Sequence, residues 1–475
     1  MASRRAVRAA LALLLPLAVA AGWAVHGAAQ ETMHLQCESF GRDPGWEGLR
    51  NRLLPQALPR VTQAFGFSRT AFAGAAGEIG GQVWRSTTPA YYAQPIARRT
   101  LDDRLAASGS FALTKSSGAS AAFFGWFDAR RQGFRPVNFL GFRLDCEAHG
   151  ATLHVSYMTA TWKAEGLNTR LRVPPDGARH TWALSYDPQA NDGGGAITFA
   201  LDGGAPHVLD LLPGHRAEGA AFNRFGLFNV QIPGGPMTVY FDDVERDGRI
   251  ERFDADPRWE GVGNRVSFVD REPEDTQDFG FSPTDFAGGA RGEAGGTFWR
   301  TEPDVPHDAW YGDRIGPLTL DDPLCADGRV AFTRGSTDSG VYLGWFNAAT
   351  RGEPPANFVG LVIEGPTRVG HYFRVAYGTA EGAAGVAETG PLIRPDGSPH
   401  RWTLSYDPSG NDGAGTLRAT LDGVPVALDL APGHKAQGAT LTHFGMFTMG
   451  RGGHHMTIYF DDLRYATGRP DAARN

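Results

Sequence analysis

Two short segments each place a pair of aspartates at the end of an apolar strand. MTVYFDDVER carries Asp242 and Asp243, and MTIYFDDLRY carries Asp461 and Asp462. Adjacent carboxylates repel each other unless a cation or hydrogen-bond donors neutralise them, and calcium takes about six to eight oxygen ligands. The pattern predicts a structural Ca²⁺ site in each half of the chain. The alternative is a strand that simply ends at the surface.

Tryptophans offer a second chemistry, because an aromatic face packs against the apolar face of a pyranose ring. Trp162, in YMTATWKAEG, has no counterpart in the YGTAEGAAG of the second half, and Trp310 stands where the first half has Tyr91. We expect the halves to bind differently, with Trp162 or Trp310 contributing, unless the difference is chance variation. The tryptophans that occur in both halves are predicted to be core residues: Trp46, Trp84, Trp126 and Trp182, matching Trp259, Trp299, Trp345 and Trp402.

Arginines and asparagines at matched positions are further ligand candidates. Arg85 and Arg300 could bind an acidic sugar or form a salt bridge to Glu78 or Glu293 in the same segment. Two further residues, each directly before a Phe, could bind sugar hydroxyls or stabilise turns: Asn138 and Asn357.

Catalytic motifs are scarce. Glu78 and Glu293, in GE(I/A)GG, are the glutamates in matched glycine-rich positions, and neither has a partner carboxylate nearby in the sequence. A glycosidase needs two carboxyl groups, and no G-x-S-x-G nucleophile motif occurs either. We therefore assign no catalytic residue, and a lyase built from distant strands remains an alternative.

The chain is an internal duplication. DPGWEG around Trp46 returns as DPRWEG around Trp259, and WALSYDPQANDGGG from Trp182 returns as WTLSYDPSGNDGAG from Trp402. The offset is 213 residues at the first of these matches and 219 at the aspartates. The repeats predict domains over 37–248 and 249–466, followed by a disordered tail over 467–475.

Each repeat reads as a series of short strands. Runs such as FFGWF, LHVSYMTATW and MTVYFDD are rich in β-branched and aromatic residues, and Gly, Pro, Asn and Asp separate them. Sustained helical periodicity is missing after residue 30. The sequence predicts an all-β chain of two tandem jelly-roll β-sandwich domains.

The pattern W-x-L-S-Y-D-P…L-D-G with a closing Y-F-D-D resembles the concanavalin A-like lectin and glucanase superfamily, including laminin-G-like domains. The resemblance covers both repeats and implies lectins, carbohydrate-binding modules, glycoside hydrolases, polysaccharide lyases or adhesion modules. Glucanases of this superfamily carry E-x-D-x-x-E on one strand, which does not occur here. Similar sugar-binding modules hold calcium with an early Glu and a late Asp, which implies Glu38 with Asp242 and Glu251 with Asp461.

Composition restricts the partners and the compartment. The net charge of -7 provides no basic footprint for nucleic acid. Residues 1–29 resemble a signal peptide, which predicts a secreted or periplasmic chain without a membrane span after cleavage, a retained anchor being the alternative. Cys37 and Cys146 could form a disulfide or remain buried thiols.

The expected function is non-catalytic, lectin-like binding of a polysaccharide or glycan. A glycoside hydrolase or polysaccharide lyase is one alternative, and an extracellular structural or adhesion module is the other.

Overall fold

The computed structural model describes residues 34–468, apart from 131–133, 148–149, 302–307, 337, 351 and 366–369. The predicted signal segment over 1–29 and residues 469–475 of the predicted tail lie outside the described residues. Thr467, the first residue of that tail, is the last residue of a strand.

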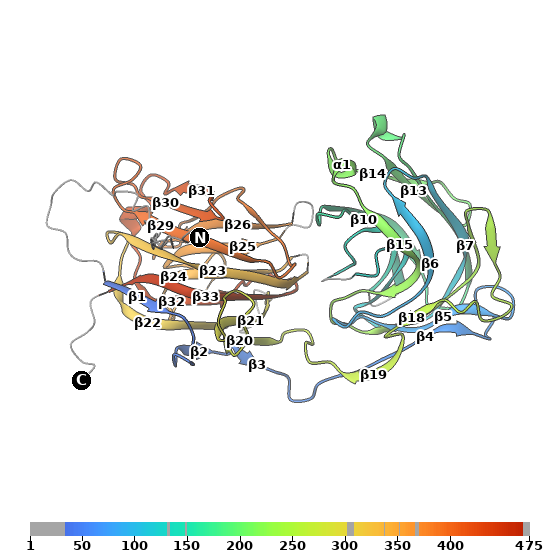
Figure 1. Cartoon of the computed structure of the whole chain (residues 1–475), viewed down its shortest axis with the longest axis horizontal. Coiled ribbons are helices and arrows are strands. Elements are labelled where there is room, and N and C mark those ends of the chain that lie inside the picture. The colour runs from blue at the N-terminus through green and yellow to red at the C-terminus, as the bar shows by residue number, and fades with distance from the viewer. Residues whose placement is uncertain are drawn as a thin grey trace, which may run out of the picture. The chain divides into compact units, whose positions relative to one another are not determined.

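The first sandwich consists of two antiparallel sheets, which confirms the all-β prediction (Figure 1). In order, the nine-stranded sheet contains β14 (His207–Asp210), β13 (Ala196–Leu201), β12 (Arg179–Asp187), β7 (Leu105–Ser116), β16 (Pro236–Arg246), β5 (Glu78–Trp84), β4 (Arg60–Ser68) and β19 (Arg265–Val269), with β17 (Arg249–Glu251) beside β16. The seven-stranded sheet contains β11 (Ala164–Val173), β10 (Gly150–Met158), β9 (Phe139–Glu147), β8 (Ser120–Phe127), β15 (Ala221–Asn229), β6 (Tyr91–Thr100) and β18 (Glu260–Val262).

The second sandwich repeats this architecture. Its nine-stranded sheet contains β3 (Arg52–Leu53), β20 (Gln277–Ser282), β21 (Glu293–Trp299), β33 (His455–Thr467), β23 (Leu324–Gly335), β29 (Pro399–Asp407), β30 (Thr416–Leu421) and β31 (Val424–Asp429), with β1 (His34–Glu38) beside β33. Its eight-stranded sheet contains β2 (Glu47–Leu49), β22 (Trp310–Leu318), β32 (Leu441–Thr448), β24 (Gly340–Phe346), β25 (Phe358–Glu364), β26 (His371–Gly378) and β27 (Ala384–Val386), with β28 (Leu392–Ile393) beside β26.

Alternating burial explains how the strands form these layers. Along β12, Trp182, Leu184 and Tyr186 point into the core while the residues between them are exposed. Helical structure in the described residues is limited to α1 (His215–Glu218) and two 3₁₀ turns, η1 (Asn191–Gly193) and η2 (Lys435–Gln437). The sheets of each sandwich therefore enclose one apolar core between them.

The predicted core tryptophans are mostly confirmed. Trp126, Trp182, Trp345 and Trp402 are at most 2% exposed. Trp259 and Trp299 are buried as well. Trp46 is partly buried against the second core, and Trp84 is half-buried with its indole Nε1 donating to the carbonyl of Gly234 at 2.7 Å. Tryptophans that recur in both repeats thus mainly build the fold.

The start of the chain belongs to the second sandwich. β1 pairs with β33, β2 with β22 and β3 with β20, so Figure 1 shows blue strands beside orange, red and yellow ones. The corresponding start of the second repeat pairs with the first sandwich, β17 with β16, β18 with β6 and β19 with β4. Each repeat therefore donates its first strands to the sandwich that is formed by the body of the other repeat.

This exchange qualifies the meaning of the repeat boundaries. The first sandwich is built from strands within 60–269, whereas the second uses 277–467 together with 34–53. The domain limits 37–248 and 249–466 stay predictions, drawn from sequence similarity and not from hydrogen bonding.

Cys37 is exposed on β1 and Cys146 is buried on β9, and the two are not joined by a disulfide. In the described residues, no helix has the length and apolar character needed to cross a membrane.

Replacing Phe40 with Ala should destabilise the second sandwich, although Phe40 lies in the first repeat. Its side chain is fully buried in the second core, with its ring centroid 5.2 Å from that of Trp46. Loss of a buried Phe costs about 3–5 kcal/mol. Hydrogen exchange should show lost protection in β22 and β33.

The matched control is Phe253→Ala. Phe253 is fully buried in the first core, beside Trp259. Exchange should therefore increase in β16 and β6 and not in β33. If Phe40→Ala instead loosened β16, the strand exchange described here would be wrong.

Candidate functional site

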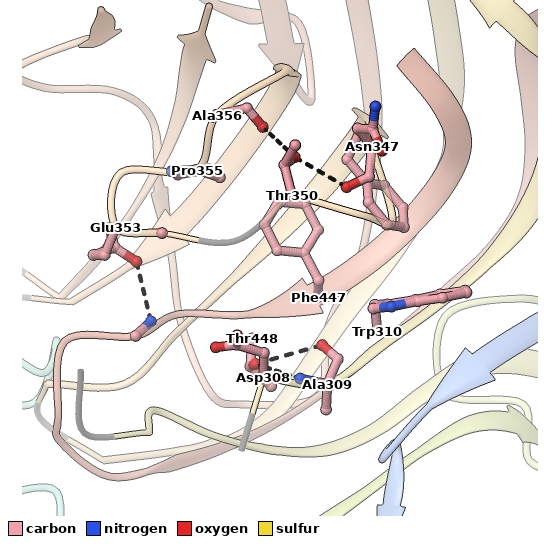
Figure 2. A pocket seen from close by; sticks show the side chains of 13 residues that line it. Asp308, Ala309, Trp310, Asn347, Thr350, Glu353, Pro355, Ala356, Phe447 and Thr448 are labelled. Carbon is pink, nitrogen blue, oxygen red and sulfur yellow. Dashed lines mark hydrogen bonds between the residues drawn. The ribbon is translucent and has the colours of Figure 1, made fainter. Parts of the chain in front are cut away.

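A pocket of about 410 Å³ opens on the eight-stranded sheet of the second sandwich (Figure 2). Aromatic rings from three strands line it, namely Trp310 of β22, Phe346 of β24 and Phe447 of β32. The ring of Phe346 lies 5.8 Å from that of Trp310 and 5.0 Å from that of Phe447, measured between centroids. These side chains form an apolar wall on the face of the sheet that points away from the core.

Polar groups from the loop between β24 and β25 complete the pocket. Thr350 Oγ1 donates to the carbonyls of Asn347 and Ala356, both at 3.1 Å, as Figure 2 shows. Glu353 accepts the Tyr342 hydroxyl at 2.7 Å and the backbone N–H of Gly450 at 3.1 Å. These bonds fix the loop, so that amide, hydroxyl and carboxylate groups surround the aromatic wall.

In the described residues of the first sandwich, the positions that match the aromatic wall are closed. Tyr91, the counterpart of Trp310, is 2% exposed, and its hydroxyl donates to Glu260. Phe127 and Phe228, the counterparts of Phe346 and Phe447, are fully buried in a second apolar cluster of that sandwich. The same positions are therefore closed in one copy and open in the other.

The other predicted tryptophan, Trp162, lies in a turn of the first sandwich. It adopts a left-handed backbone with φ of 64° and is partly buried against the second apolar cluster of that sandwich. Its neighbours in the turn are held by hydrogen bonds, including one from the Lys163 ammonium to Glu218 at 2.6 Å. Its role in binding stays a prediction.

The predicted arginines occupy matched positions with different partners. Arg300 is paired with Glu364 at 3.3 Å, and Arg85 lies close enough to Asp145 and Glu274 for their charges to act on it. Glu78 and Glu293, proposed above as the alternative partners of these arginines, form no ion pair within the described residues. Their buried carboxylates instead accept backbone N–H groups, Ala73 N–H at 2.7 Å for Glu78. Such a buried, amide-bonded carboxylate is poorly placed to act as an acid.

Both predicted asparagines form hydrogen bonds with the backbone. Asn138 and Asn357 are buried with left-handed φ angles of 62° and 52°. The side-chain oxygen of Asn138 accepts the N–H of Ala221 at 3.1 Å, and that of Asn357 accepts the N–H of Thr440 at 2.8 Å. Asn tolerates this backbone region and can hydrogen-bond nearby groups, so the geometry matches the turn interpretation.

The four residues predicted to bind metal do not have the predicted neighbours. Glu38 is the register partner of Leu463, on the strand of Asp461, and Glu251 is the partner of Val244, on the strand of Asp242. The glutamates whose charges act on the buried carboxyls are instead Glu78 for Asp242 and Glu293 for Asp461. The strand exchange explains the changed pairing of Glu38 and Glu251. The oxygens of Glu38 and Glu251 accept the N–H groups two residues further on, at 2.7 and 3.3 Å.

The two inward-facing aspartates are unusual. Asp242 is fully buried and Asp461 is 1% exposed, and burial raises the pKa of each carboxyl to about 6. One oxygen of each accepts the next backbone N–H at 2.7 Å. The structure therefore settles which aspartate of each pair faces inward, because Asp243 and Asp462 form surface ion pairs instead.

The surroundings of the Asp242 carboxyl have some of the features that a cation site needs. Oδ2 of Asp242 is buried and accepts no hydrogen bond of ordinary geometry within the described residues, although the backbone N–H of Ala75 is close enough to lower the pKa of this carboxyl. A Cβ on Gly74 would lie 2.0 Å from this oxygen, so only glycine allows the loop to approach it. The described residues contain no group of three or more His, Cys, Asp or Glu side chains placed to hold a metal. A cation would thus depend on few carboxylates and on backbone carbonyls.

Sequence reasoning identified Trp310 but missed Glu353 and Phe447. The available signal was the comparison of the repeats, because Glu353 stands where the first repeat has Phe134. A charged residue that replaces an aromatic one at a matched position marks a place where the copies diverged. The rest of the pocket depends on long-range strand pairing, which local sequence does not show.

No family model matches the chain, and no curated protein matches it. Among solved structures, mouse laminin α1 domains LG4-5 match 87% of this chain and 92% of their own at 13% identity, with a TM-score of 0.26. The GH43 protein BlXynB of Bacillus licheniformis matches 74% and 75% at 12% identity, with a TM-score of 0.23. None of these scores reaches 0.5, so function has to follow from the residues themselves.

The buried aspartates predict a pH dependence in metal-free buffer. Their folded-state pKa of about 6 lies above the ordinary value of 3.8 for an aspartate, so their stabilising contribution is complete below about pH 4 and is lost as pH rises through about 6. Denaturation at about pH 4.5 and about pH 8, in chelator, should show Asp242→Asn gaining roughly 2–3 kcal/mol relative to the parent as pH rises. Asp461→Asn should behave alike.

Asp210→Asn is the control, because Asp210 is an exposed carboxylate of the first sandwich. Its stability difference from the parent should change little between the two pH values. Parallel pH profiles for Asp242→Asn and the parent would contradict the assignment of these buried carboxyls.

Proposed function

We propose that this protein is an extracellular, non-catalytic carbohydrate-binding protein whose main sugar site is the aromatic pocket of the second sandwich. The observation that carries the proposal is Trp310, a half-buried indole on the outer face of a sheet that lines a pocket of about 410 Å³ with two further rings. Ligand pockets commonly have volumes of about 300–1,000 Å³ and combine apolar walls with a few polar groups.

The pocket combines the two kinds of contact that a sugar needs. The faces of Trp310 and Phe447 can pack against the C–H groups of a pyranose ring. Asn347, Thr350 and Glu353 surround the same space with hydrogen-bonding groups that can bind hydroxyls.

The remaining parts of the proposal concern family and location. Membership of the concanavalin A-like superfamily is supported by two β-sandwiches that carry the W-x-L-S-Y-D-P strands as core elements. Secretion or periplasmic location is supported by the leader-like residues 1–29. Two sandwiches in one chain can gain avidity on a polymer that offers repeated epitopes.

Calcium belongs to the same proposal. Asp242 with Glu251, and Asp461 with Glu38, would provide carboxylate oxygens near the inward strand ends, and a bound Ca²⁺ would offset the cost of ionising the buried aspartates. Its role would be structural, since it would join the exchanged strands β1 and β17 to their host sheets. Support comes from the buried Oδ2 of Asp242, which accepts no hydrogen bond of ordinary geometry within the described residues.

Trp310→Ala should weaken glycan binding about tenfold or more, because it removes the largest aromatic face of the pocket. The measurement is a glycan array with the full chain, followed by titration of the best neutral oligosaccharide. Trp310→Phe should retain part of the affinity, since a ring remains.

Trp162→Ala is the matched control, since Trp162 lies in the first sandwich and outside the aromatic pocket. We expect its affinity for the neutral oligosaccharide to equal that of the parent. Loss of binding with Trp162→Ala and not with Trp310→Ala would move the site to the first sandwich.

The calcium proposal has its own test. Millimolar calcium should raise the unfolding temperature of the parent relative to chelator, and the double variant Asp242→Asn/Asp461→Asn should lose that response because both inward carboxylates are removed. The comparison needs differential scanning calorimetry at neutral pH. Equal unfolding temperatures of the parent with calcium and with chelator would rule out the site.

A further inference from the structure

A strand of the first repeat borders the aromatic pocket of the second sandwich. β2 pairs with β22, and Leu49 of β2 is the register partner of Trp310. Glu47, at the start of β2, is the register partner of Gly312 on the same strand of the pocket. The strand that carries the largest ring of the pocket is therefore hydrogen-bonded to a segment of the other repeat.

Ring contacts hold Trp310 in place. Its indole Nε1 is buried, and within the described residues it has no hydrogen-bond partner. The centroid of the indole instead lies 5.0 Å from that of the His443 ring and 5.8 Å from that of Phe346. His443 is itself buried. The orientation of the indole therefore depends on where the His443 ring is held.

Hydrogen bonds on two sides fix the His443 ring. Its Nε2 lies 3.2 Å from Oε2 of Glu47, and its Nδ1 lies 2.9 Å from Oγ1 of Thr442. Burial lowers the pKa of His443, so the ring is neutral at neutral pH. An ionised carboxylate can only accept a hydrogen bond, so Nε2 donates to Glu47 and Nδ1 accepts the Thr442 hydroxyl.

The same chain of hydrogen bonds reaches the loop that lines the pocket. Oγ1 of Thr442 accepts the backbone N–H of Ala348 at 3.4 Å. Ala348 lies in the loop between β24 and β25, which provides the polar groups of the pocket. Glu47 is therefore connected through His443 and Thr442 to both the aromatic wall and the polar loop.

A second partner holds Glu47 at the surface. Nε and Nη2 of Arg314 donate to the two oxygens of Glu47 at 2.7 and 3.1 Å. These hydrogen bonds lower the pKa of Glu47, so the carboxylate beside His443 is ionised at neutral pH. The Arg314 side chain is 61% exposed, and an ion pair of that kind contributes little to stability. The distinctive contact of Glu47 is therefore the one to the buried histidine.

The first sandwich makes the matched contact directly. Glu260, the counterpart of Glu47, accepts the hydroxyl of Tyr91. Tyr91 is buried, whereas Trp310, which stands at its position, has no hydroxyl to donate. In the second sandwich the carboxylate therefore acts through a histidine, and the indole remains half-buried at the pocket.

We propose that Glu47 is a positioning residue for the sugar site, so that the first repeat completes the aromatic pocket of the second sandwich. This inference rests on the proposed carbohydrate-binding function and adds a regulation to it, because sugar affinity depends on the docking of β2. Glu47 does not line the pocket and acts through His443, which supports Trp310.

The test is calorimetric titration of the full chain with three neutral sugars, cellohexaose, laminarihexaose and mannohexaose. Glu47→Ala should weaken the hexasaccharide that the parent binds most tightly by about threefold to tenfold, because His443 loses its hydrogen bond to the carboxylate. Glu47→Gln keeps an oxygen that can accept from Nε2 and should restore most of the affinity. Equal affinities of Glu47→Ala and the parent would overturn the proposal.

The matched control is Glu260→Ala, which removes the corresponding carboxylate from the first sandwich. Its affinity for the same hexasaccharide should equal that of the parent. A loss as large as that of Glu47→Ala would mean a general effect on both exchanged strands and would overturn the specific role of Glu47. If Glu47→Ala does not fold, Thr442→Val replaces it, because this change removes the hydroxyl that holds His443 from the other side.

Near-ultraviolet circular dichroism gives a readout that needs no sugar. Glu47→Ala should change the tryptophan bands of the ligand-free chain, and this change should be absent when both chains also carry Trp310→Phe. A role in stability alone would lower the unfolding temperature and leave the bands of the folded chain unchanged. That result would contradict the positioning of Trp310 by Glu47.

Hydrogen exchange tests the coupling in the opposite direction. If docked β2 strengthens sugar binding, bound sugar must strengthen the docking of β2 by the same factor. The hexasaccharide should therefore slow exchange in β2 and not in β18, the matched strand of the first sandwich. Unchanged exchange in β2 with bound sugar would reject the coupling.

Failure of this inference is separable from failure of the proposed function. Sugar binding by the parent that is lost with Trp310→Ala and unchanged with Glu47→Ala would reject the positioning role alone. Absence of binding by the parent to every hexasaccharide and every array glycan would reject the proposed function and this inference together.

Discussion

The antiparallel pairing of β1 with β33 and of β17 with β16 is the constraint on which the rest of the structure depends. Each pairing covers an edge that would otherwise expose unpaired backbone groups. It also carries Phe40 and Phe253 into opposite cores, where both are fully buried. The chain has therefore not simply placed one finished domain after another, because each sandwich is completed by the opening strands of the other repeat.

With this strand exchange, each repeat has to preserve the residues that both cores need. The core tryptophans, the paired strands and the buried aspartates are the same in both sandwiches because both folds need them. The outer faces of the smaller sheets contribute less to the cores, so they could diverge. One now carries an open aromatic pocket around Trp310, and the other a buried Tyr91 whose hydroxyl donates to Glu260. A duplicated fold thereby presents two different chemical surfaces.

The sequence predicted much of this and missed specific parts for physical reasons. Repetition and strand periodicity were sufficient for an all-β chain of two sandwiches, and recurrence identified Trp126 and Trp345 as core. The strand exchange was not predictable, because the repeated segments can pair within one sandwich or between repeats without any change of sequence pattern. For that reason Glu38 was assigned to Asp242, when it lies beside the strand of Asp461. Glu353 and Phe447 were missed because their place in one pocket depends on the pairing of distant strands, which only coordinates reveal.

The buried aspartates carry a cost that is the same in both sandwiches. At Asp242 and Asp461 the fold keeps a carboxyl group away from water, where a neutral residue of similar size would cost less. One oxygen of each carboxyl accepts the next backbone N–H, which offsets part of this cost. Under the calcium proposal a bound cation would offset more of it, because a ligand that brings the missing counter-charge stabilises the folded state.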